Sequence, residues 1–144
     1  FVSYSSIDRA SIVEPLAKKL KESGYEIWVD NLGDEYVGIR PAKRWRQELA
    51  NALNQSGVVV FIMTPDSIKS QWTQAELKRA GEAKIPVLGV KFRLLDDSYL
   101  NQIKIGDDSL TDLHYIDLVK LGYEKGFEAL LSSLEEIGVR RVSK

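Results

Sequence analysis

The sequence predicts an α/β domain in which helices cover both faces of a parallel β-sheet. Strand-like and helix-like segments alternate along the chain, which is typical of repeated βα units. The segment Val58–Met63 reads VVVFIM and is apolar at every position, without the alternation of a half-exposed strand. A strand of that kind is buried on both faces, as in a parallel sheet. The 144 residues, 44% of them hydrophobic and 28% charged, suit one globular domain.

The chain begins with a predicted strand and helix. Phe1–Tyr4 is short and apolar enough for a buried strand. A helix is predicted from Arg9 to Ser23, because Ile12, Leu16 and Leu20 recur at i, i+4 and i+8. Gly24 stands where a glycine C-cap belongs. Three residues before the helix are of the capping kind: Ser5, Ser6 and Asp8.

A long polar connection separates the second predicted strand from the second helix. Tyr25–Val29 is rich in aromatic and β-branched residues and predicts a strand. Asp30–Ala42 follows and exceeds the usual length of a βα loop, which is typical of functional or mobile loops. A helix is predicted over Lys43–Gln55, with Trp45 near its start, and Val58–Met63 is the third strand.

The second half repeats the pattern. Thr64–Ser67 predicts a turn and a cap, and Ser70 is the candidate N-cap of a helix ending near Lys84. The remaining elements are two strands and a helix, predicted at Ile85–Val90, Leu113–Ile116 and Tyr123–Ile137. Five parallel strands in the order 2-1-3-4-5 would place a ligand crevice between the ends of the first and third strands.

Composition and motifs exclude several kinds of function. A net charge of −1 argues against a general electrostatic grip on nucleic acid or on an anionic membrane. No apolar run approaches the ~20 residues needed to cross a bilayer. Without cysteine, and with His114 as the single histidine, a thiolate or multi-histidine metal site is hard to build. The glycine-rich phosphate-binding patterns GxGxxG and GxxxxGK[ST] are missing.

Trp72 and Glu76 are the best candidates for chemistry. They lie four residues apart and would share one face of a helix. One carboxylate can promote glycosidic cleavage when the leaving group is already activated, as a positively charged nicotinamide is. An aromatic ring one turn earlier could stack on a base. The residues alone leave the opposite interpretation open, in which Glu76 is a surface glutamate beside Arg79 and Trp72 belongs to the core.

Several segments together resemble TIR domains. FVSYSSID at Phe1–Asp8 resembles the first signature box of that family, and YEIWVD with WRQELANAL resembles its second strand and following helix. Ser56–Leu77 resembles the strand and helix that carry the pattern S-x-x-[YF]-x-x-S-x-W-x-x-x-E. The resemblance implies a flavodoxin-like fold with a catalytic glutamate at Glu76. It also implies a set of substrate-binding residues: Trp72, Trp45, Tyr4, Ser5 and Ser6.

The resemblance leads to a functional hypothesis. We expect one TIR-like domain over residues 1–144, cut from a longer multidomain bacterial protein. It would cleave NAD+ at the nicotinamide–ribose bond, with NAD+ as substrate and neither a cofactor nor a metal. Self-association through Asp30–Ala42 and a place in cytoplasmic antiphage signalling are also implied. The alternative is a non-catalytic module that associates with other TIR domains through Asp30–Ala42 and the neighbouring helices. In that loop this chain departs from the family's R-D-x-x-P-G pattern and has Gly33-Asp34-Glu35 and Gly38-Ile39-Arg40-Pro41.

Overall fold

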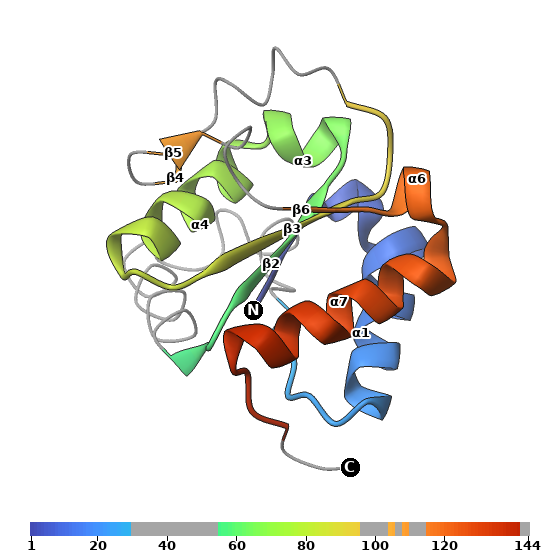
Figure 1. Cartoon of the computed structure of the whole chain (residues 1–144). Helices are drawn as coiled ribbons and strands as arrows, with labels where there is room; N and C mark the ends of the chain where they lie inside the picture. Colours follow the sequence, from blue (N-terminus) through green and yellow to red (C-terminus); the bar gives the residue numbers. More distant parts are fainter. Residues whose placement is uncertain (30–54, 96–103, 106–107, 110–114, 142–144) are drawn as a thin grey trace.

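A parallel β-sheet lies at the centre of the domain. The computed structural model describes residues 1–29, 55–95, 104–105, 108–109 and 115–141 (Figure 1). Within them the sheet runs in the order β1-β2-β3-β6. Its strands are β1 (Val2–Ser3), β2 (Val59–Met63), β3 (Val87–Lys91) and β6 (Tyr115–Asp117). All three pairings are parallel, which confirms the predicted α/β class.

The expected second strand, Tyr25–Val29, makes a smaller contribution than predicted. Val29 forms an isolated parallel bridge with Val2, and the Val2 amide donates to the Trp28 carbonyl at 3.0 Å. The segment therefore lies beside β1 on the side away from β2. A five-stranded sheet in the order 2-1-3-4-5 remains a prediction, as does the flavodoxin-like detail.

Helices cover both faces of the sheet (Figure 1). On one face lie α1 (Glu14–Glu22) and α7 (Tyr123–Ile137), and on the other lie α3 (Pro65–Lys69) and α4 (Gln71–Glu82). Because side chains alternate along a strand, β2 contributes side chains to the apolar cores on both faces of the sheet. Val60 and Ile62 join the core of α1 and α7, whereas its other three side chains join the second core: Val59, Phe61 and Met63. This double burial explains why VVVFIM contains no polar residue.

Local signals place most helix ends correctly. The π-helix η2 (Arg9–Val13) leads into α1, so the two together cover the predicted first helix. Gly24 follows α1 with a φ of 98°, which favours glycine. Ser70 caps α4, since its Oγ accepts from the Thr73 amide at 3.4 Å. The bounds of α7 agree with the prediction.

Some short elements were not predicted. They are η1 (Ser6–Asp8), α6 (Leu118–Leu121) and an antiparallel pair formed by β4 (Lys104–Ile105) and β5 (Asp108–Ser109). The predicted Asp30–Ala42 connection and nearly all of the Lys43–Gln55 helix lie outside the described residues. In the part of the chain that is described, no helix is long and apolar enough to cross a membrane.

Candidate active site

The carboxyl ends of β1 and β2 lie side by side, because the two strands are parallel neighbours. The loop after β1 leads through Tyr4 and Ser5 into η1, and Thr64 follows β2 directly. This is the edge of the sheet where the sequence predicted a crevice. Buried polar side chains concentrate near this edge, at the end of β1, in the loops after β1 and β2, and in the helices η1, α3 and α4: Ser3, Ser5, Asp8, Thr64, Ser67, Thr73 and Glu76.

Glu76 lies in the layer between α4 and the sheet. The buried residues of α4 follow helical spacing, at Thr73, Glu76, Leu77 and Ala80, so that this stripe faces the strands. The Glu76 side chain is 1% exposed, and its Oε1 accepts a hydrogen bond from Ser3 Oγ at 2.9 Å. The interpretation of Glu76 as a surface glutamate beside Arg79 is therefore wrong.

A network of caps fixes the start of α4 against the end of β2. Thr64 and Ser67 form a capping box, in which each side chain accepts from the other's backbone amide, at 3.2 and 2.9 Å. Thr73 Oγ1 donates to the Ser67 carbonyl and also to the Ser70 carbonyl. These contacts set the position of the first turn of α4, and so of Glu76 one turn further on.

Asp8 connects the two loops rather than capping a helix. It precedes η2, but its side chain makes no cap hydrogen bond there, which corrects the capping role expected from the sequence. Instead Asp8 Oδ2 accepts from Thr64 Oγ1 at 2.6 Å, and the Asp8 residue is 3% exposed. Because a hydrogen bond to a carboxylate is short and strong, it ties the loop after β1 to the loop after β2.

The structure places some predicted site residues and not others. Tyr4 is buried in the core on the α1 and α7 side, the face opposite Glu76, and Ser5 is buried in the loop after β1. Trp72 lies in the first turn of α4. Trp45 and the side chains of Ser6 and Trp72 lie outside what the structure describes. Substrate contacts by these five residues remain predictions.

Ser3 is the residue that the sequence analysis missed. The sequence gives little indication of a role for Ser3, because a single serine at the end of a short apolar strand is common. The spacing of residues could not reveal its partner, which is 73 positions away.

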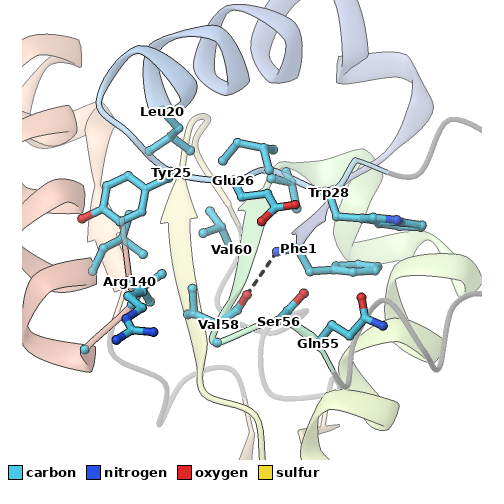
Figure 2. Close-up of a pocket in the computed structure, with 16 residues that line it drawn as sticks. Phe1, Leu20, Tyr25, Glu26, Trp28, Gln55, Ser56, Val58, Val60 and Arg140 are labelled. Atoms are coloured by element: carbon cyan, nitrogen blue, oxygen red, sulfur yellow. Dashed lines mark hydrogen bonds between the residues drawn. The ribbon is translucent and has the colours of Figure 1, made fainter. Parts of the chain in front are cut away.

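A cavity of about 470 Å³ lies at the amino ends of the same strands (Figure 2). It is lined by Phe1, by residues around Glu26 and Val58, and by Arg140 after α7. The Phe1 and Trp28 rings stack beside it, with centroids 4.8 Å apart. Of the predicted site residues whose side chains the structure describes, Glu76, Tyr4 and Ser5, none lines this cavity, which lies at the opposite ends of the strands from the Glu76 site.

The arrangement at the carboxyl ends is a buried carboxylate on a helix, held by a hydroxyl from the first strand. In the described ranges, no group of three or more histidine or acidic side chains is placed to hold a metal.

The chain belongs to the TIR-domain family, whose pattern matches residues 1–131.

Three curated bacterial relatives match over 77 residues, or 54% of this chain. The chain is 29% identical to the 2' cyclic ADP-D-ribose synthase BtTIR of Bacteroides thetaiotaomicron. It is 30% identical to the NAD(+) hydrolase PdTIR of Paracoccus denitrificans and 31% identical to the 2' cyclic ADP-D-ribose synthase AbTIR of Acinetobacter baumannii. The matches span 25%, 24% and 27% of these relatives, about a quarter of their length.

The fold has a solved counterpart. The TIR domain of a Toll-related receptor from Hydra magnipapillata superposes with a TM-score of 0.69, covering 94% of each chain at 19% identity. At that identity the likeness concerns the fold alone.

Proposed function

We propose that this domain cleaves NAD+ at the nicotinamide–ribose bond, with Glu76 as the catalytic carboxylate. The observation that carries the proposal is the burial of Glu76 in α4 with Oε1 hydrogen-bonded to Ser3. The names of the bacterial relatives, NAD(+) hydrolase and 2' cyclic ADP-D-ribose synthase, support the same chemistry. The product, linear or cyclic, depends on which nucleophile captures the ribosyl group.

The chemistry requires little beyond a well-placed negative charge. The bond between ribose C1' and the nicotinamide nitrogen breaks, and its electron pair neutralises the pyridinium, so the leaving group needs no proton. The ribosyl centre becomes cationic as the bond lengthens, and a nearby carboxylate stabilises that charge. A carboxylate in a buried layer does this more strongly than one in water, because the surrounding dielectric is low. Water then adds at C1', giving ADP-ribose and releasing a proton.

The test compares Glu76→Gln with a matched variant on the same helix. Glutamine keeps the size of the side chain and removes its charge. We expect NAD+ turnover, followed by chromatography of nicotinamide release, to fall by about 100-fold or more. Glu82→Gln alters an exposed glutamate in the last turn of α4 and should leave turnover within about twofold of wild type. Turnover that survives in folded Glu76→Gln protein would assign the chemistry to another group.

We further propose, from family membership, that copies associate through the Asp30–Ala42 region and act in cytoplasmic antiphage signalling. Activity that depends on association should rise per molecule with protein concentration. Specific activity that stays constant from a dilute monomer to a concentrated sample would contradict this requirement. An assembling protein that never consumes NAD+ would favour the non-catalytic module instead.

A further inference from the structure

Ser3 is a polar residue in an otherwise apolar layer. It pairs in register with Phe61 of β2, and parallel partners in register point to the same face of a sheet. The neighbouring side chains on this face form an apolar core that includes Phe1, Val59, Phe61 and Met63. The Ser3 side chain is 0% exposed. A hydroxyl at such a position is costly to bury unless it is hydrogen-bonded, so its partner explains its presence.

The partner is the Glu76 carboxylate, which is itself costly to bury. The hydrogen bond from Ser3 Oγ to Glu76 Oε1 is 2.9 Å long and joins β1 to the middle of α4. Apolar residues of similar size can replace a buried polar pair without loss of stability, and often with a gain. Stability therefore does not account for the pair. The presence of the buried pair is better explained by the role of the Glu76 carboxylate in the site.

We propose that Ser3 is a positioning residue for Glu76, whose hydroxyl holds the carboxylate in one orientation and in its ionised form. The inference rests on the proposed function, since orientation and charge matter because Glu76 stabilises a ribosyl cation. A hydrogen bond donated to the charged form of an acid favours that form. It also restrains a side chain that has three rotatable bonds.

The position of Ser3 suits this role. β1 pairs with β2 on one side, and on the other it meets the bridge from Val2 to Val29. The Ser3 hydroxyl is thus attached to backbone that is held on both sides. A group on a rigid element holds its partner more accurately than a group on a loop.

Three serine variants test the proposal. Ser3→Ala removes the hydroxyl, and Ser3→Cys keeps a weaker donor of similar size. Ser23→Ala is the matched control, because its hydroxyl donates to the Lys19 carbonyl at 2.9 Å, at the end of α1. We expect kcat for NAD+ cleavage to fall about tenfold in Ser3→Ala, with KM within about twofold of wild type. Ser3→Cys should be intermediate, and Ser23→Ala should match wild type.

The pH profile separates positioning from a merely structural role. Without the hydrogen bond the carboxylate protonates more readily, so activity should disappear at a higher pH on acidification in Ser3→Ala than in wild type. Because a less stable protein also unfolds at a higher pH on acidification, the folded fraction is measured by circular dichroism at each pH and activity is expressed per folded molecule. After that correction, lower stability alone leaves the midpoint unchanged. Wild-type pH dependence in Ser3→Ala overturns the proposal. So does a Ser3→Ala protein with higher kcat, because the bond would then restrain Glu76 rather than position it.

A readout independent of activity keeps this inference distinct from the proposed function. In protein labelled with 13C at glutamate carboxyl groups, the Glu76 resonance is identified by its loss in Glu76→Gln. Its titration midpoint should lie at a higher pH in Ser3→Ala than in wild type or Ser23→Ala. If wild type consumes no NAD+, the proposed function fails while this titration still tests Ser3. An unchanged midpoint overturns the role of Ser3 even in an active enzyme.

Discussion

Replacement of Thr64 by valine should destabilise the domain by about 3 kcal/mol. Valine keeps the branched shape and suits the extended backbone of Thr64, whose φ is −137° and ψ 163°. It removes two hydrogen bonds of the hydroxyl. The bond accepted from the Ser67 amide caps α3, and loss of such a cap costs about 1 kcal/mol. The bond donated to Asp8 Oδ2 at 2.6 Å involves a carboxylate, and bonds of that kind contribute about 1.5–3 kcal/mol.

Urea denaturation followed by circular dichroism measures the effect. In a domain of this size the loss corresponds to a fall in Tm of roughly 6–12 °C. Thr64→Ser is the control, because it keeps the hydroxyl and should cost less than about 1.5 kcal/mol. A double-mutant cycle with Asp8→Asn should give a coupling energy of about 1–3 kcal/mol between the two sites. A loss below about 1 kcal/mol in Thr64→Val, or a coupling near zero, would refute the idea that this bond connects the two loops.

Two further predictions concern the packing of α7. Gly126→Ala should destabilise by about 1–2 kcal/mol in thermal or urea unfolding, because an added Cβ would lie 2.5 Å from Leu118 Cγ. In a protein that already carries Leu118→Ala, Gly126→Ala should stabilise the domain instead of destabilising it. If Gly126→Ala destabilises that protein as much as it destabilises wild type, a clash with Leu118 is not the cause. Leu130→Ala, at a side chain that is 0% exposed, should cost about 2–5 kcal/mol, whereas the half-buried neighbour Leu131 should lose clearly less as alanine. Equal losses at the two positions would mean that α7 does not pack as described.

Much of the fold could be predicted because local signals and burial agree. Val58–Met63 is apolar throughout since both faces of β2 are covered, and Ser70 begins α4 because its side chain caps the helix. Tyr123–Ile137 has a regular inner stripe and ends before Gly138, whose φ is 91°. α6 escaped prediction because its four residues are too few to show a helical period.

The candidate site was predictable only in part. Trp72 and Glu76 share one helix, so their spacing is a local property of the sequence. The burial of Glu76 and its bond to Ser3 depend on how α4 packs on β1, which no local pattern encodes. The same holds for Asp8, since its type suggested a helix cap and its actual partner is 56 residues away. Tertiary packing determines the partners of both Glu76 and Asp8, so residue type and spacing could not predict them.

The hydrogen bond between Ser3 and Glu76 also has a consequence for folding. α4 can form from local contacts, but Ser3 reaches Glu76 only after β1 has docked beside β2, across a long intervening stretch of chain. Contacts of such sequence separation form slowly, because the loop must close before they stabilise anything. A nascent or partly unfolded chain would therefore carry the carboxylate without the group that holds it. If the domain cleaves NAD+ as proposed, it would reach its full rate only once the sheet is complete.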